Sequence, residues 1–370
     1  MKLLSIVIPS RNREYYCIEA LKDILSYDRD DFEVCVCDNS DTDQLEEYVK
    51  EKNDPRVLYQ HIKGRINSVI NMDKAMRMAT GEYVCMIGDD DTILPAIFEV
   101  AEWAKKKGCD NVTPRDMVTY FWPGALVEKG ILKWPVRAND GTVEELNCEV
   151  QLEKFVRNGC LTYSDFLPRV YHGIVRRSIL DQILKETGHI IGGLSPDIYM
   201  SISTACHCKS YMLISKPISV AGACGNSATS WSNTGGHRGG LEDIPHLYKR
   251  GPYTWDERVP KVFTVQTIWA ETAMKAFEEM GREDLISRVN QGYLYAEMIR
   301  KNRGMKNILT TAISEAIPVR SKLANNLKFI KYFILKPIQR LGRGEIKQIT
   351  VEGANDIAEA TKQYMESISK

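Results

Sequence analysis

The first hundred residues alternate between short apolar runs and segments with helical spacing. The apolar runs are residues 3–9, 32–37, 57–60 and 83–87. Continuous runs of this length are typical of strands that are buried on both faces of a sheet. Helical patterns at 15–25 and 67–79 lie between them. Strands that alternate with helices in this way predict an α/β fold with a mainly parallel, doubly wound sheet.

Polar turns follow three of the predicted strands. These turns are Ser10-Arg11-Asn12, Asp38-Asn39-Ser40 and Asp89-Asp90-Asp91. In an open parallel sheet, ligands bind outside the carboxyl ends of the strands. We therefore expect the three turns to meet at one edge of the sheet and to form a ligand site.

The acidic turn points to a cation. Asp89, Asp90 and Asp91 are consecutive, and no basic residue stands between Gly81 and Leu94. Adjacent carboxylates repel one another unless a positive charge neutralises them. Hard oxygen ligands of this kind suit Mg²⁺ or Mn²⁺, with phosphate oxygens completing the shell. An acidic turn or helix N-cap is the alternative explanation.

Composition narrows the class of protein. The 370 residues include 49 basic and 49 acidic side chains, which disfavours a chain that binds polyanions over its whole surface. No apolar stretch approaches the ~18 residues that a membrane-spanning helix needs, and the N-terminal apolar run is too short for a signal peptide. The ten cysteines sit mostly inside apolar runs. These features predict a reduced, cytoplasmic protein without a disulfide scaffold.

Several segments together resemble glycosyltransferase family 2. They are Ser5 to Asn12, Val36 to Ser40, Asn71 to Ala75, Ala79 to Val84 and Asp89 to Asp91, and the likeness continues to Ser195-Pro196-Asp197, Gly222, Ser227 and Ser230. The resemblance covers roughly residues 1–230, in order and spacing. It implies a GT-A fold, which is Rossmann-like with a mainly parallel central sheet, and an inverting, metal-dependent transferase.

The resemblance also implies roles for single residues. Pro9, Ser10 and Arg11 would line the nucleotide pocket, and Asp38 would accept a hydrogen bond from the base. Arg65 and Asn71 match the region that approaches the diphosphate and ribose. Asp91 would bind the metal ion, and Asp89 or Asp90 would share the contact with nucleotide and metal. Gly88 stands where many members have the first Asp of an Asp-x-Asp-Asp run, so the choice among the three carboxylates stays open.

Asp197 matches the catalytic base of the family. An acceptor hydroxyl must lose its proton as it attacks the anomeric carbon of the sugar, and a carboxylate opposite the leaving diphosphate can take that proton. From the residues alone, Pro196 and Asp197 equally well mark the first turn of a helix, which we expect to run to Ala205.

Beyond the first hundred residues the pattern is less regular, until helical spacing returns at Lys261. Residues 222–240 are rich in Gly, Ser and Asn and are typical of a loop that closes over a site. We predict a GT-A catalytic domain followed by a helical C-terminal region. Their bounds are 1–240 and 241–370, and the first divides into a nucleotide-binding half, 1–108, and an acceptor half with the closing loop, 109–240.

Two further groups of metal-binding side chains are weaker evidence for a metal site. Cys206-His207-Cys208 is too compact for all three side chains to bind one zinc ion, and no second pair with finger spacing follows. A packed helix or strand is the simpler interpretation. His237, in the Gly-rich loop, suits either a contact with the metal or diphosphate, or a solvated side chain.

A basic amphipathic segment follows the predicted helices. Between Lys322 and Arg343 the chain has six basic residues, no acidic ones and one apolar stripe at helical spacing. Such a helix suits the surface of an anionic membrane. A helix that packs on the catalytic domain with a solvated basic face explains the pattern equally.

These features predict an inverting glycosyltransferase with Mn²⁺ or Mg²⁺ as cofactor. It would move a sugar, with UDP as the expected carrier, to a hydroxyl of a glycan or polyprenyl-linked glycan in surface-polysaccharide synthesis. It would act in the cytoplasm or at the cytoplasmic face of the inner membrane, without nucleic acid. A nucleotidyltransferase is a second candidate, although Ser10-Arg11-Asn12-Arg13 lacks the Gly-rich phosphate cradle. A non-catalytic assembly protein with a transferase fold is the third.

Overall fold

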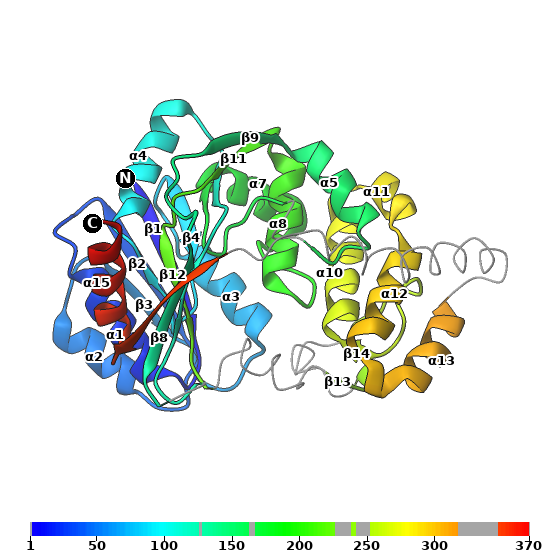
Figure 1. Cartoon of the computed structure of the whole chain (residues 1–370), viewed down its shortest axis with the longest axis horizontal. Coiled ribbons are helices and arrows are strands. Elements are labelled where there is room, and N and C mark those ends of the chain that lie inside the picture. The colour runs from blue at the N-terminus through cyan, green and yellow to red at the C-terminus, as the bar shows by residue number, and fades with distance from the viewer. Residues whose placement is uncertain are drawn as a thin grey trace.

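A computed structural model describes residues 2–125, 128–162, 167–225, 238–241, 252–316 and 347–369. The larger of its two main sheets has eight strands in the order β3-β2-β1-β4-β10-β6-β11-β9 (Figure 1). The first four in this order are parallel: β1 (Leu4–Ser10), β2 (Phe32–Asp38), β3 (Val57–His61) and β4 (Tyr83–Met86). The predicted parallel sheet is therefore confirmed for this half, and its strands lie close to the predicted ranges.

The other half of this sheet is mixed. Its strands are β6 (Asn111–Pro114), β9 (Val143–Asn147), β10 (Ile174–Arg176) and β11 (Ser210–Ile214). Strand β10 runs antiparallel to both β4 and β6, whereas β6 and β11 are parallel. Because β10 turns back beside β4, the segment before it reaches the carboxyl end of β4.

Helices cover both faces of the large sheet. One face packs against α1 (Glu14–Leu25), α2 (Gln44–Lys52) and α4 (Ala96–Lys107). The opposite face packs against α3 (Ser68–Arg77), α7 (Arg177–Thr187) and α8 (Pro196–His207). Side chains alternate along each strand, so Ile6 and Ile8 enter one core and Val7 the other.

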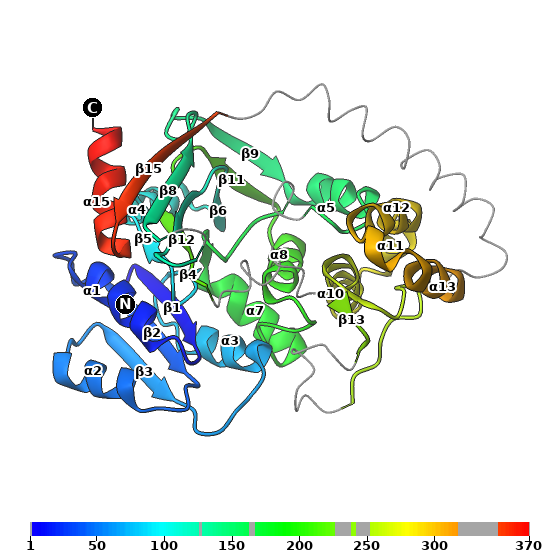
Figure 2. The ribbon, with the colours of Figure 1, turned by 60° about the horizontal axis from the view of Figure 1, so that its bottom comes forward.

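A second sheet contains the C-terminal strand of the described chain. Its order is β15-β8-β7-β12-β5, with β5 (Thr92–Ile93), β7 (Val118–Phe121), β8 (Gly130–Pro135), β12 (Ser219–Ala223) and β15 (Gln348–Ala354). Helix α15 (Ile357–Ile368) then lies beside α1 (Figures 1 and 2), where the Thr361 hydroxyl donates to Asp23 at 3.4 Å.

This return of the chain differs from the predicted helical region 241–370. Residues 348–354 extend the second sheet next to β8, where Ile349 and Val351 alternate with polar residues. The domain bounds 1–240 and 241–370 stay a prediction, and within the second range the described residues 347–369 form β15 in the second sheet and a helix beside α1.

The remaining helices form a bundle on the side of α8 away from the sheet (Figure 2). They are α5 (Cys148–Arg157), α10 (Val265–Glu279), α11 (Glu283–Arg288), α12 (Gln291–Lys301) and α13 (Lys306–Ala316), with a short 3₁₀ helix, η3 (Arg303–Met305), before α13. A two-stranded ribbon pairs β13 (Arg238–Gly239) with β14 (Phe263–Thr264). Phe277 and Leu294 share one apolar core with Val84 of the sheet, so the bundle is continuous with the catalytic part.

Among the described residues, no helix combines the length and the apolar character needed to cross a bilayer. The predicted basic amphipathic helix, Lys322–Arg343, lies outside the described residues, as does His237 with most of the predicted closing loop.

Candidate active site

The turns that follow β1 and β2 are locked together by hydrogen bonds. Arg11 donates through Nη1 to the carbonyl and the side-chain oxygen of Asn39, at 2.7 and 2.9 Å. The Asn12 backbone N–H donates to the Ser40 hydroxyl at 2.8 Å, and Asp41 N–H donates to the Asn12 side chain at 2.8 Å. Asn12 adopts a φ of 52°, which an asparagine tolerates. Two of the three predicted turns, Ser10-Arg11-Asn12 and Asp38-Asn39-Ser40, therefore form one surface, as expected. We call this surface the platform.

Two predicted nucleotide-binding residues lie in this platform. Asp38 is fully buried, and its carboxylate accepts the Ser40 backbone N–H and the Tyr59 hydroxyl, each at 2.8 Å. Asn71 donates to the Ser10 carbonyl at 3.1 Å and to the Cys37 carbonyl at 3.3 Å. Its Oδ1 atom is buried and has no hydrogen-bond partner among the described residues. An orphaned buried acceptor is costly, so it marks a place where a bound molecule with an O–H or N–H group fits.

Pro9 and Arg65 occupy different environments. Pro9 lies in β1 and pairs with Cys37 in the sheet. Arg65 is exposed on the segment between β3 and α3. The pKa of Asp41 is lowered by its hydrogen bond from Asn12 and by the charges of Arg11 and Arg65, so Arg65 lies close to the platform.

Both carboxylate oxygens of Asp91 accept hydrogen bonds from protein groups. Its Oδ2 atom accepts the Gly88 N–H at 2.5 Å and the Tyr171 hydroxyl at 3.0 Å, and the His172 ring lies 3.2 Å away. Its Oδ1 atom accepts the Gly222 N–H at 2.7 Å. Burial raises the pKa of Asp91, but His172 and the two N–H groups outweigh burial and hold the pKa below its usual value. The Asp91 carboxylate therefore stabilises the conformation of the turn.

Asp89 and Asp90 have a different partner, the guanidinium of Arg13. Asp89 also accepts the Ser10 hydroxyl at 2.8 Å, which joins the acidic turn to the platform. Asp90 accepts the Cys224 N–H through Oδ2 at 3.1 Å, while its Oδ1 accepts no hydrogen bond from a described residue. Burial raises the pKa of both carboxyls, that of Asp90 to about 6, although the charge of Arg13 opposes the shift. Through Ser10 and Arg13, Asp89 and Asp90 therefore lie beside the loop that follows β1.

A glycine allows the second sheet to pack against this turn. A Cβ atom on Gly222 would lie 1.7 Å from the Asp90 carbonyl oxygen, so only glycine fits there. The Trp122 indole donates to the same carbonyl at 2.9 Å. Gly222 in β12 and Trp122 directly after β7 thus hold the acidic turn from the second sheet.

Asp197 lies on a different element, in the first turn of α8. The Ser195 hydroxyl donates to its Oδ1 atom at 2.7 Å. The segment before α8 is fixed by α10, where Thr272 Oγ1 accepts the N–H groups of Leu194 and Ser195 at 3.0 and 2.9 Å.

Four residues that hold this site have no predicted role: Arg13, Tyr171, His172 and Thr272. Tyr171 and His172 belong to the segment that leads into β10, and His172 has a φ of 59°. Their neighbours in the sequence give no signal, because their partner Asp91 comes close only after β10 has turned back beside β4.

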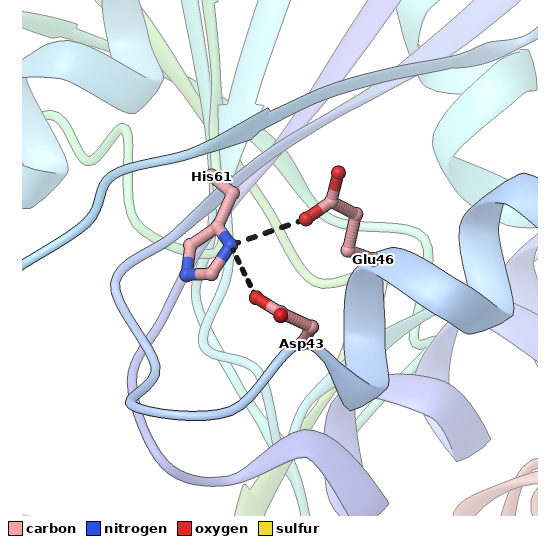
Figure 3. A group of neighbouring side chains, drawn as sticks. All are labelled: Asp43, Glu46 and His61. Atoms are coloured by element: carbon pink, nitrogen blue, oxygen red, sulfur yellow. Dashed lines mark hydrogen bonds and ion pairs between the residues drawn. The ribbon is translucent and has the colours of Figure 1, made fainter.

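Two further groups of polar side chains have structural partners. His207, at the end of α8, bonds the Ser203 carbonyl at 2.7 Å and Glu186 at 2.9 Å, as a packed helix end would. At the outer edge of the platform, Nδ1 of His61 lies 3.3 Å from both Asp43 and Glu46 (Figure 3), and its Nε2 lies 3.1 Å from the Ser40 carbonyl. The carboxylates and the Ser40 carbonyl raise the pKa of His61 against the effect of burial, which favours an imidazolium in this position.

The half-parallel sheet, with its buried acidic turn at the end of β4, is the GT-A fold of glycosyltransferases. The chain is similar to glycosyl transferase family 2, whose family model matches residues 5–134. The expected fold and the resemblance to this family are thereby confirmed.

Curated relatives agree with this family. The chain is 36% identical over 95 residues to the putative colanic acid biosynthesis glycosyl transferase WcaA of Escherichia coli K12. This match covers 25% of this chain and 34% of the relative. It is 32% identical over 99 residues to the Campylobacter jejuni GalNAc(5)-diNAcBac-PP-undecaprenol β-1,3-glucosyltransferase, covering 25% and 31%. The match thus spans about a third of each relative.

Among solved structures, the chain resembles S. aureus TarS 1–349 in complex with UDP-GlcNAc. The TM-score is 0.51 at 17% sequence identity, and the match covers 93% of both chains. At this identity the likeness shows a shared fold.

Proposed function

We propose that this glycosyltransferase moves a sugar from a UDP-linked donor to a hydroxyl of a glycan or lipid-linked glycan, with inversion at the anomeric carbon. The observation that supports a donor site is the buried acidic turn, which Ser10 joins to Asn71. The side-chain oxygen of Asn71 has no hydrogen-bond partner among the described residues. The solved relative holds UDP-GlcNAc, and the Campylobacter relative is named for an undecaprenol-linked acceptor. Both support this choice of donor and acceptor class.

In this proposal the nucleotide lies on the platform formed by the turns after β1 and β2. Asn71 Oδ1 accepts a hydrogen bond from the nucleoside, and Ser10 and Arg11 define the floor of the pocket. Arg65 is exposed next to the platform and would approach the diphosphate. Asp38 already accepts two protein donors, so its contact with the base uses a remaining lone pair or acts through Ser40.

The acidic turn fits a divalent metal ion through Asp90 and Asp89 better than through Asp91. Asp90 has a carboxylate oxygen without a partner among the described residues, whereas Asp91 would have to give up donors from Gly88, Tyr171, His172 or Gly222. We therefore move the expected metal contact from Asp91 to Asp90 and assign Asp91 to holding the turn. A bound Mn²⁺ or Mg²⁺ would neutralise charge on the leaving diphosphate.

Asp197 is the proposed base. Its partner Ser195 and the contacts of Thr272 fix the start of α8, so the carboxylate keeps one orientation. A fixed carboxylate can take the proton of the acceptor hydroxyl as the new glycosidic bond forms and the bond to the diphosphate breaks.

Release of the nucleotide tests this function. The full chain is incubated with UDP-, dTDP- or GDP-sugars, Mn²⁺ and a polyprenyl-linked glycan. We expect UDP release from a UDP-sugar, and a loss of turnover of roughly 10²–10⁴-fold in Asp197→Asn with UDP affinity unchanged. Asp181→Asn, an exposed carboxylate on α7, is the control. Pyrophosphate release from UTP and a sugar phosphate would instead identify a nucleotidyltransferase.

We also propose that Lys322–Arg343 brings the enzyme to an anionic membrane surface, where a lipid-linked acceptor would lie. Each basic residue near such a surface contributes about 1 kcal/mol. Co-sedimentation with vesicles of anionic and neutral lipid tests this. Binding to anionic vesicles that is lost at high salt supports the proposal, and a chain that stays in the supernatant at low salt contradicts it.

A further inference from the structure

Arg13 contributes a positive charge to the acidic turn from the loop after β1. Its guanidinium contacts Asp89 Oδ1 through Nη2 and lies 3.5 Å from Asp90 Oδ2 through Nη1. Nη1 also lies 3.5 Å from the sulfur of Cys224. The side chain is 23% exposed, while those of Asp89 and Asp90 are 1% and 5% exposed. The pair of carboxylates and the guanidinium therefore form one largely buried ionic group.

The three carboxylates divide into two sets by their partners. Asp91 takes its donors from Gly88, Tyr171, His172 and Gly222, and none of these is an arginine or lysine. Among the described residues, Asp89 and Asp90 each have one neutral donor, from Ser10 and Cys224 respectively, and the positive charge beside both comes from Arg13. Removing that cation would leave two buried carboxylates close together without charge compensation, which is strongly unfavourable.

A divalent ion and the guanidinium need the same two carboxylates, because Arg13 contacts Asp89 Oδ1 and lies near Asp90 Oδ2, so a metal ion bound by Asp89 and Asp90 would lie beside the guanidinium. Two cations within a few ångströms repel strongly in a partly buried site, where the effective dielectric constant is low. The guanidinium and the metal ion therefore cannot both bind Asp89 and Asp90 tightly at the same time. The negative charge of a diphosphate would shift this balance, because it adds ligands for the metal and a second anion for the arginine.

We propose that Arg13 is the resident counter-ion of Asp89 and Asp90, and that a divalent metal ion binds at the acidic turn only by exchange with its guanidinium. The inference rests on the proposed function in that it takes this turn to be the metal site of the donor. It assigns to Arg13 control over metal affinity in the absence of nucleotide. By linkage, nucleotide and metal then strengthen each other's binding by the same factor.

A Mn²⁺ titration without nucleotide tests this exchange. The free-ion electron paramagnetic resonance signal is followed for the full chain and for Arg13→Gln. We expect Arg13→Gln to bind Mn²⁺ more tightly than the unsubstituted chain, by about fivefold or more. Arg29→Gln is a matched control, because Arg29 also pairs with two carboxylates, Asp31 and Glu102, at an exposed site; it should bind Mn²⁺ as the unsubstituted chain does. Equal or weaker binding by Arg13→Gln overturns the proposal.

Thermal unfolding supplies a second readout that separates exchange from a merely structural role. Arg13→Gln should unfold at a lower temperature, and Mn²⁺ should restore its stability in a concentration-dependent way while leaving the unsubstituted chain unchanged. Arg13→Lys, which keeps the charge, guards against a variant that does not fold. It should bind Mn²⁺ weakly, like the unsubstituted chain, and tight binding by the lysine variant overturns the proposal.

These measurements use no sugar donor, so their failure is distinguishable from failure of the proposed transferase activity. A chain that binds Mn²⁺ more tightly after Arg13→Gln but never releases UDP would support the exchange and contradict the proposed donor. A chain that turns over UDP-sugars but whose Mn²⁺ affinity is unchanged by Arg13→Gln would support the proposed donor and contradict the exchange.

Discussion

The hydroxyl oxygen of Thr272, on helix α10, accepts the backbone N–H of Ser195 at 2.9 Å, two residues before Asp197. The same oxygen accepts the N–H of Leu194 at 3.0 Å. A helix of the C-terminal bundle therefore fixes the start of α8 and the carboxylate proposed as the base. Because the bundle and the sheet share one apolar core, this link is rigid.

Thr272→Val should uncouple the bundle from the base. Valine has nearly the same shape but leaves two buried N–H groups without an acceptor, at a cost of about 1–3 kcal/mol each. We expect turnover to fall roughly 10- to 100-fold through loss of orientation, with UDP affinity unchanged. Thr272→Ser keeps the acceptor and should keep most of the turnover. Steady-state kinetics beside UDP titration measure both, and an equal loss in the two variants would argue against the hydrogen bonds.

Gly222→Ala should disturb the acidic turn. The added Cβ would lie 1.7 Å from the Asp90 carbonyl oxygen, so the backbone must shift. Overpacking of this kind costs about 1–3 kcal/mol, and the contacts of Trp122 and Asp91 would weaken with it. We expect a lower unfolding temperature and weaker UDP binding. Gly225→Ala, whose nearest atom would lie at 4.0 Å, is the matched control and should behave like the unsubstituted chain. Unchanged UDP affinity in Gly222→Ala would count against a donor site at this turn.

Asp91→Asn should lower the stability of the fold more than it weakens metal binding. An asparagine has one acceptor oxygen, so its NH₂ group would face either the Gly222 N–H or the donors from Gly88 and Tyr171. Each donor left unpaired costs about 1–3 kcal/mol. Asp90→Asn, by contrast, should keep the unfolding temperature and lose the Mn²⁺ dependence of UDP binding. Calorimetry with UDP titration compares the two, and the opposite pattern would return the metal contact to Asp91.

Stability should fall with rising pH because of Glu271, which is fully buried on α10. Burial raises its pKa to about 7, against hydrogen bonds from the Asp256 N–H and the Tyr253 hydroxyl at 3.0 Å each. The folded state holds this proton more tightly than the unfolded state, so its contribution is complete below pH ~4.5 and is lost as pH rises through ~7. The shift corresponds to about 3 kcal/mol at most.

Glu271→Gln removes this dependence, because glutamine can accept from Asp256 and donate to Tyr253. Urea unfolding at several pH values between about 5 and 8 checks it. We expect the two chains to converge near pH 5 and the variant to be the more stable one near pH 8. A variant whose stability declines with pH as steeply as the unsubstituted chain would show that another group is responsible.

The sequence predicted the edge of the sheet at which the site lies, because strand patterns and polar turns are local. Ser10, Asp38, Asn71 and Asp89 meet there as expected. The cation of the acidic turn was not predictable in the same way. We expected a metal ion since no basic residue stands near the turn in the sequence, yet the fold brings Arg13 from the end of β1.

Other partners depend equally on tertiary structure. Tyr171 and His172 reach Asp91 only because β10 runs antiparallel beside β4. Strand β15 was missed because a short alternating segment between helical patterns has a weak signal, and its pairing partner β8 lies far away in the sequence. Packing between distant segments decides such positions.

We propose the acidic turn after β4, together with the platform at the ends of β1 and β2, as the donor site of a nucleotide-sugar transferase. The most direct measurement is a crystal structure of the full chain soaked with UDP and Mn²⁺, with anomalous data for the manganese. We predict an anomalous peak at Asp90, UDP density over the platform with a donor group at Asn71 Oδ1, and Arg13 displaced from Asp89. UDP bound elsewhere, or manganese bound away from the acidic turn with Arg13 still paired to Asp89, would contradict the account.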